Sequence, residues 1–109
     1  MTKEFEALFA KVRTFGWDNN KRDRTLRELG IDFDEVRFVF DGPTVAYRSD
    51  RRGEVRFVVF GFLDDREIAV VCTFRDDVCW IISARRARKD ERKKYYDRLP
   101  RRPAPKRQD

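Results

Sequence analysis

The sequence predicts a single α+β domain with N-terminal helices, a four-stranded antiparallel sheet and a basic C-terminal helix. Apolar residues recur at helical spacing before residue 41, and in alternating or continuous short runs from residue 44 to residue 83. Those runs follow one another over short connections, which is typical of an antiparallel meander. A chain of 109 residues suits one domain with one modest core.

Three helices are expected before the sheet. Thr2 can cap the first, over residues 2–13, whose apolar stripe makes it a packing helix. After a short connector that ends at Trp17-Asp18, either Asp18 or Asn19 can cap the second, which runs to about Leu29 and stops at Gly30. A third covers residues 34–40.

Four strands are expected after the break at Asp41-Gly42-Pro43. They cover residues 44–47, 55–61, 68–74 and 78–83, with a polar turn at 49–53, a loop at 63–67 and a tight turn at 75–77. The second strand is apolar apart from Arg56. A charge there must be paired or exposed at a cleft, and the sequence leaves both interpretations open.

The stretch from Ile81 to Tyr96 joins the last strand to a basic helix of about residues 87–99. A small Ser83-Ala84 step is expected to form a turn, after which Arg85 and Arg86 are adjacent. Arginine guanidinium groups present forked donors that suit phosphate oxygens. The alternative is a solvated helix face beside a charged strand end.

The net charge of +6 is distributed unevenly. Residues 1–84 hold 14 Lys and Arg against 16 Asp and Glu, whereas residues 85–109 hold 12 against 4. The excess of positive charge in the last quarter points to a polyanion or an acidic partner. Residues 100–109, basic and rich in proline, are expected to form a disordered tail.

Cysteine and histidine usage narrows the function. Cys72 and Cys79 lie in neighbouring strands, where a disulfide is possible but two buried thiols are the better interpretation. The chain has no histidine, so the commonest acid–base group and metal ligand are both missing, and no metal site or cofactor is expected. No signal peptide or membrane span is recognisable, and a cytoplasmic protein is predicted.

Three blocks of sequence resemble the BrnT family, the ribonuclease toxins of a bacterial type II toxin–antitoxin system. The blocks are Phe15-Gly16-Trp17-Asp18 with Lys21, Leu26-Arg27 and Gly30-Ile31-Asp32-Phe33; Phe40-Asp41 with Pro43, Glu54, Arg56-Phe57 and Gly61; and residues 81–87 with Glu91 and Tyr95-Tyr96. They occur in family order over residues 15–97. Residues 1–14 form an additional N-terminal helix, and residues 1–99 a single toxin domain.

The resemblance implies a RelE-like ribonuclease fold and a metal-independent endoribonuclease that blocks translation and arrests growth. RNA is cleaved by attack of its own 2′-hydroxyl group. The implied partner is a BrnA-like antitoxin, a ribbon-helix-helix protein, in a tetramer of two toxins and two antitoxins. Operator DNA is contacted only through the antitoxin, and no membrane is involved.

Ten residues are the predicted site. The catalytic set is Lys21, Glu54, Arg56, Arg85 and Arg86, and the RNA-binding set is Arg88, Lys89, Arg92, Tyr95 and Tyr96. The arginines can stabilise charge on the phosphorane if the strands bring them together, and Lys21 and Glu54 are the candidates for proton transfer. Each also has a structural interpretation: Arg56 paired with Glu54, Glu54 as a turn residue, Lys21 as a surface lysine, and one tyrosine packing the helix onto the sheet.

Members of the family often carry histidines after the opening helix and in the polar turn, whereas this chain has Leu29-Gly30 and residues 49–53 there. Phe74 and Trp80 also replace commonly polar residues, and Arg88 stands where a capping Ser or Thr would be expected. The second hypothesis is therefore a degenerate member that binds RNA or an antitoxin without cleaving. A plain DNA-binding protein is the weakest hypothesis, because no helix-turn-helix is recognisable.

Overall fold

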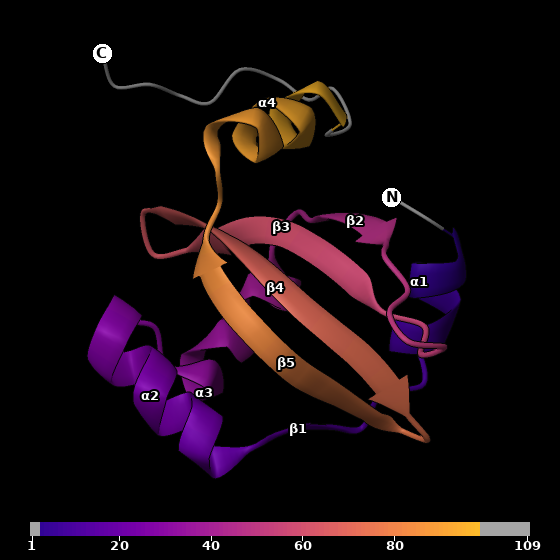
Figure 1. Cartoon of the computed structure of the whole chain (residues 1–109). Coiled ribbons are helices and arrows are strands. Elements are labelled where there is room, and N and C mark those ends of the chain that lie inside the picture. Colours follow the sequence, from indigo (N-terminus) through magenta and orange to yellow (C-terminus); the bar gives the residue numbers. More distant parts are fainter. Residues whose placement is uncertain (1–2, 99–109) are drawn as a thin grey trace.

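The computed structural model describes residues 3–98 (Figure 1). Its elements, in chain order, are α1 (Lys3–Phe9), β1 (Thr14–Trp17), α2 (Asn19–Leu29), α3 (Phe33–Val36), the 3-10 helix η1 (Arg37–Asp41), β2 (Val45–Arg48), β3 (Phe57–Leu63), β4 (Arg66–Arg75), β5 (Val78–Arg86) and α4 (Lys89–Arg98). The expected Thr2 cap, Leu99 and the 100–109 tail lie outside the described residues. None of the helices within residues 3–98 is long and apolar enough to span a membrane.

The caps of the early helices confirm the sequence reading. The Asp18 carboxylate accepts from the backbone N–H of Asn20 at 2.8 Å, and Gly30 ends α2 with a φ of 69°. The Asp32 carboxylate accepts from the N–H of Asp34 at 3.0 Å at the start of α3. Side-chain acceptors at the N-terminus and a left-handed glycine at the C-terminus are local signals, so the sequence alone located these ends.

The sheet has five strands in the order β1-β5-β4-β3-β2, so the prediction of four antiparallel strands was wrong at one edge. Strands β2 to β5 form the expected antiparallel meander, while β1 pairs in parallel with β5 from Thr14↔Val78 to Trp17↔Ile81. Within this pairing a Cβ on Gly16 would lie 2.8 Å from the Trp80 ring. Four residues that become a strand only by pairing with a distant segment carry too short a pattern to be recognised.

Strand ends also differ from the prediction. Strand β5 continues through Arg86, pairing Ala69↔Arg85 and Ile68↔Arg86, so there is no turn at Ser83-Ala84. Strand β3 begins after Arg56 rather than before it. The expected 63–67 loop is a turn of two residues, Asp64-Asp65, because Leu63 pairs with Arg66. Pairing across the sheet extended the strands beyond their apolar centres.

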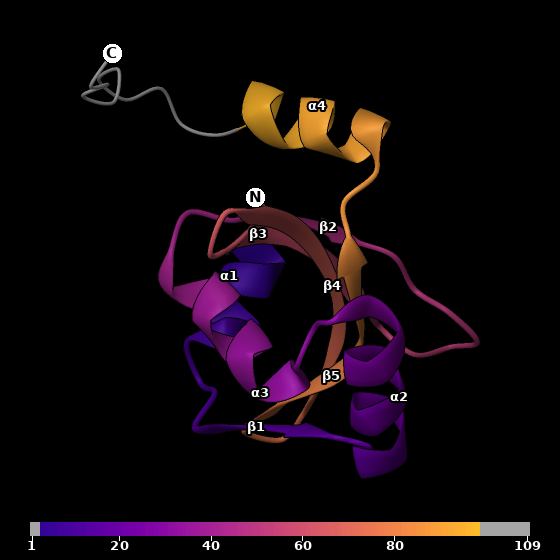
Figure 2. The ribbon, with the colours of Figure 1, turned by 90° about the vertical axis from the view of Figure 1, so that its left-hand side faces the viewer.

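One face of the sheet carries the main core. Figure 2 shows α1, α3 and η1 together on this side. Phe5 of α1 is only 3% exposed and contacts the rings of Phe9, Phe40, Phe57 and Phe74, so the N-terminal helix is a packing helix as expected. Cys72 and Cys79 are buried here as free thiols, which confirms that interpretation. Contact with Cys79, together with burial, raises the pKa of the Cys72 thiol.

The opposite face is covered at one end only, by α4 (Figure 1). Val45, Phe60 and Ala69 form a small second core there with Tyr95 of α4, which is 2% exposed. The Tyr95 hydroxyl donates to the Pro43 carbonyl at 3.0 Å. The remainder of this face has no helix laid over it, and it is the surface available to a large partner.

Candidate functional site

The open face is the part of the second sheet surface that α4 leaves uncovered. Side chains alternate along a strand, so residues opposite to the main core lie on it: Tyr47, Val58, Val71, Ser83 and Arg85. The segment 49–56 projects beside it, to the right of the strands in Figure 2. This segment is turned by Arg52 and Gly53, both with positive φ, and is closed by an Arg51↔Glu54 bridge.

Arg85 does not present its guanidinium to solvent. Its Nη1 and Nη2 donate to the two carboxylate oxygens of Glu91 at 2.7 and 2.8 Å. Glu91 also accepts from the backbone N–H of Arg88 at 2.8 Å, so it fulfils its half of a capping box without a Ser or Thr at Arg88. The bidentate pair therefore attaches the first turn of α4 to the end of β5.

The pKa of Glu91 shows how tightly the pair is held. The hydrogen bonds from Arg85, and secondarily the Arg88 N–H, lower it from 4.5 to about 2. A lowered folded-state pKa stabilises the fold above the unfolded value, and this stabilisation is lost as the pH falls from about 4.5 to about 2.

We therefore expect the free energy of unfolding of the wild type to exceed that of Glu91→Gln near neutral pH. The difference should shrink as the pH falls from about 5 to about 2, because the wild-type carboxylate becomes protonated and then resembles the amide. Urea unfolding of both proteins across this range measures it. A difference that does not change with pH would contradict the assignment.

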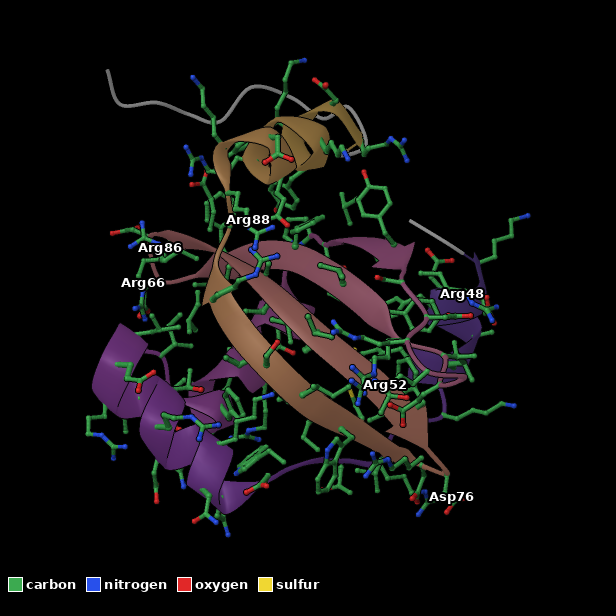
Figure 3. All side chains as sticks on the ribbon, in the orientation of Figure 1. Arg48, Arg52, Arg66, Asp76, Arg86 and Arg88 are labelled. Carbon is green, nitrogen blue, oxygen red and sulfur yellow. The ribbon has the colours of Figure 1, made fainter. Side chains whose placement is uncertain are left out.

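Arg86 and Arg88 differ from Arg85. Both side chains are exposed, and neither forms an ion pair with a carboxylate among residues 3–98. Figure 3 shows them on opposite sides of the link between β5 and α4. The exposed Lys89 is also unpaired within the described chain, whereas Arg92 donates to the Ala87 carbonyl at 3.1 Å and lies 3.6 Å from Glu67. The available cations of the predicted set thus gather at the start of α4.

Glu54 and Arg56 lie at the other end of the open face. Arg56 Nε donates to Glu54 at 2.9 Å, and Arg75 Nη2 reaches the second carboxylate oxygen at 3.4 Å. The Arg56 hydrogen bond, more than that of Arg75, lowers the pKa of Glu54. Arg75, which sequence reasoning did not single out, also lies 4.8 Å from the Trp80 ring centre.

The structure does not join the two arginine groups into one cluster. Arg85 lies in the row of Ala69 and Phe60, and Arg56 comes four residues before Phe60. Four strand residues span about 13 Å, so Arg56 and Arg85 cannot hold the same phosphate oxygen. The open face therefore has a cationic site at each end, a spacing suited to successive groups of an extended chain.

Lys21 lies on the side of α2 that turns toward the rest of the fold. It is half-buried and stands one helical turn before Thr25, which is buried. Its ammonium group makes no ion pair or hydrogen bond among the described residues. The structure brings it into contact with neither Glu54 nor the arginines.

The two tyrosines of α4 have different environments. Tyr95 is buried in the second core, which is the packing interpretation and keeps its ring from a solvent-side base. Tyr96 is 51% exposed, and its hydroxyl donates to Glu67 at 2.7 Å. Burial, followed by the Glu67 hydrogen bond, raises the pKa of Tyr96 to about 12, so this phenol releases its proton less readily than usual.

A hollow of about 290 Å³ lies where α4 meets the open face. Tyr47, Val58 and Phe60 line it from the sheet, and Asp90 and Lys94 from the helix. Sequence reasoning missed all of these residues as site residues. The two-residue alternation of β2 could have placed Tyr47 on this face, but only the docking of α4 places Asp90 and Lys94 opposite it.

These features define a small, basic α+β protein with a half-covered sheet and a cationic helix start. The chain belongs to the BrnT family: the family model described as "Ribonuclease toxin, BrnT, of type II toxin-antitoxin system" matches residues 17–91. The chain is also similar in fold to the ribonuclease toxin BrnT of Brucella abortus, whose crystal structure has been solved. The two superpose with a TM-score of 0.54 at 22% identity, over 72% of this chain and 100% of that one. No curated protein matches this chain.

Proposed function

We propose that this chain is the toxin of a type II pair and that it cleaves RNA on the open face, without a metal, by attack of the RNA 2′-hydroxyl. The observation that carries the proposal is the pair of exposed, unpaired arginines Arg86 and Arg88 at the end of the open face. Guanidinium groups without a carboxylate partner among residues 3–98 are available to phosphate oxygens.

The proposed roles follow the contacts. Arg86 and Arg88 bind the phosphates beside the scissile bond, and Lys89 adds charge along α4. Arg56 and Glu54 bind or activate the chain at the far end of the face, and Lys21 on α2 supplies a proton-transfer group. Arg85, Arg92 and Tyr95 hold α4 in place through Glu91, Glu67 and Pro43, and Tyr96 does so through Glu67.

The proposed biology follows from the family. A BrnA-like ribbon-helix-helix antitoxin would mask the basic end of the molecule, in an assembly of two toxins and two antitoxins that alone touches operator DNA. We propose a cytoplasmic protein in which residues 1–99 form one toxin domain. The RelE-like classification of its fold remains a prediction.

A second function is favoured by one specific observation, the state of Glu54. Two arginines hold this carboxylate as an anion with a lowered pKa, which makes it a weak base, and the chain has no histidine to replace it. On this account the protein binds RNA or its antitoxin without cleaving.

The test is incubation with a defined RNA in EDTA, comparing the wild type with Arg86→Ala/Arg88→Ala. The matched control is Lys11→Ala/Arg13→Ala, which removes two exposed charges near the start of β1. We expect wild type and control to cleave, leaving 2′,3′-cyclic phosphate ends, and the test variant to be slower by about tenfold or more.

Equal cleavage by the test variant would remove Arg86 and Arg88 from the site. RNA binding with a steep salt dependence but no cleavage by the wild type, on free RNA or ribosomes, would favour the non-catalytic function. In that case the slope of affinity against salt should fall by about one unit per lost phosphate contact.

A further inference from the structure

The hollow between the open face and α4 has walls of two kinds. The sheet side consists of the Tyr47 ring with Val58 and Phe60, and the Tyr47 and Phe60 rings meet edge to face at 5.7 Å. The helix side consists of Asp90 and Lys94, one turn apart on α4, and Ser49 adds a hydroxyl at the rim. A flat apolar wall facing polar groups suits a planar ligand with a polar edge.

Most charged groups near this hollow are already engaged. Arg48 is held by Asp50 and Glu4, and Glu91 by Arg85. Asp90 and Lys94, in contrast, make no ion pair among residues 3–98, either with each other or with another residue. The hollow thus presents one carboxylate and one ammonium group whose hydrogen bonds are available to a ligand.

Tyr47 carries the second unusual feature. Within the described part of the chain, its hydroxyl is the one buried side-chain polar atom without a hydrogen-bond partner. Such atoms are rare in native structures and call for an explanation. The Arg98 guanidinium carbon lies 5.2 Å from the ring centre, a flexible exposed cover that can move aside.

We infer that this hollow is a subsite for one unstacked base of the RNA, and that the base it prefers is guanine. The inference rests on the proposed function, since it places the base beside the phosphates bound by Arg86 and Arg88. The base packs on the Tyr47 ring, as single-stranded bases pack on aromatic side chains in RNA-binding proteins.

The preference for guanine follows from the polar groups. Guanine carries two adjacent donors, N1–H and the N2 amino group, which match the two oxygens of one carboxylate, here Asp90. Its O6 and N7 acceptors match a lysine ammonium, here Lys94. Adenine has an acceptor at N1, which would face the carboxylate, and a phosphate would be repelled by it. The Tyr47 hydroxyl is left to bond a ring nitrogen or the ribose.

A structural role explains only part of this arrangement. Asp90 lies in the first turn of α4, where a carboxylate stabilises any helix, and the Tyr47 ring packs against Phe60. Neither role needs the buried hydroxyl of Tyr47, because phenylalanine would pack equally well there. The hydroxyl is therefore the group that separates the two explanations.

The experiment measures binding of fluorescent five-nucleotide RNAs by anisotropy. Their sequence is uridine throughout except for a central guanine, adenine or uridine, and 2′-O-methyl groups prevent cleavage. For the wild type we expect the guanine RNA to bind about tenfold more tightly than the adenine RNA. Asp90→Asn and Tyr47→Phe should each reduce this preference to about twofold. The control Asp23→Asn, an exposed and unpaired carboxylate on α2, should retain it.

Folding is checked in the same samples. Tyr47→Phe keeps the ring and removes an unsatisfied hydroxyl, so its thermal midpoint should equal or exceed that of the wild type. A variant that melts no earlier but loses the preference supports the subsite. Equal affinity of the wild type for all three RNAs, or full preference in both variants, overturns the subsite and leaves RNA binding by the toxin standing. Failure of the wild type to bind any RNA overturns both.

Discussion

Replacing Arg85 by alanine is expected to lower RNA cleavage by about a hundredfold or more while the sheet remains folded. The reason is positional, since the guanidinium is engaged by both oxygens of Glu91 at 2.7 and 2.8 Å and is not available to a phosphate. Without it, the first turn of α4 loses its attachment to β5, and an uncompensated carboxylate is left beside the bound RNA. The displaced Arg88 no longer meets its phosphate.

Stability and activity should respond differently to this change. Loss of one charge-assisted pair at a half-buried site costs about 1–3 kcal/mol, too little to unfold a domain of ordinary stability. Cleavage of a defined RNA in single turnover, with urea unfolding of the same protein, measures both effects.

Two controls distinguish a positioning role from a catalytic one. Glu91→Gln keeps Arg85 but weakens its tether, so it should also slow cleavage. If Arg85 itself stabilised the phosphorane, Glu91→Gln would release it and cleavage would be kept or increased. A further outcome, full cleavage by Arg85→Ala, would show that neither the residue nor the tether of α4 matters.

Gly61→Val is expected to destabilise the domain by about 3 kcal/mol or more, enough to leave a large unfolded fraction near body temperature. Gly61 is buried in the middle of β3 beneath η1, and a Cβ there would lie 2.7 Å from Val39 Cγ1 and 3.3 Å from Thr44 Cγ2. Alanine should cost about 1–3 kcal/mol, and valine more, because β3 and η1 must separate to admit the larger side chain.

Gly42 provides the control for this prediction. A Cβ on Gly42 would meet nothing within 4 Å, and its φ of −104° suits any residue. Gly42→Val should therefore melt within a few degrees of the wild type, whereas Gly61→Val should melt well below it. Differential scanning calorimetry of the three proteins measures this. Equal melting of the two variants would show that η1 can move away from β3 without loss.

Local patterns were sufficient for much of the fold. The Asp18 and Asp32 caps, the Gly30 stop, the meander from β2 to β5 and the basic last helix each rest on residues within one turn or one strand of each other. Three blocks of sequence in family order also predicted the BrnT family, which the family model over residues 17–91 confirms.

Pairing between distant segments determined the remainder. Strand β1 exists because Gly16 fits beneath Trp80, 64 residues further along the chain, and four residues carry no pattern strong enough to predict that. The same applies to the site. A sequence shows that Arg85 and Arg86 are adjacent arginines, but strand alternation sends them to opposite faces, and the docking of α4 gives one of them to Glu91 and leaves the other unpaired within residues 3–98. The charge of a side chain is a property of its residue type, whereas its availability depends on which neighbours the fold brings within hydrogen-bonding distance.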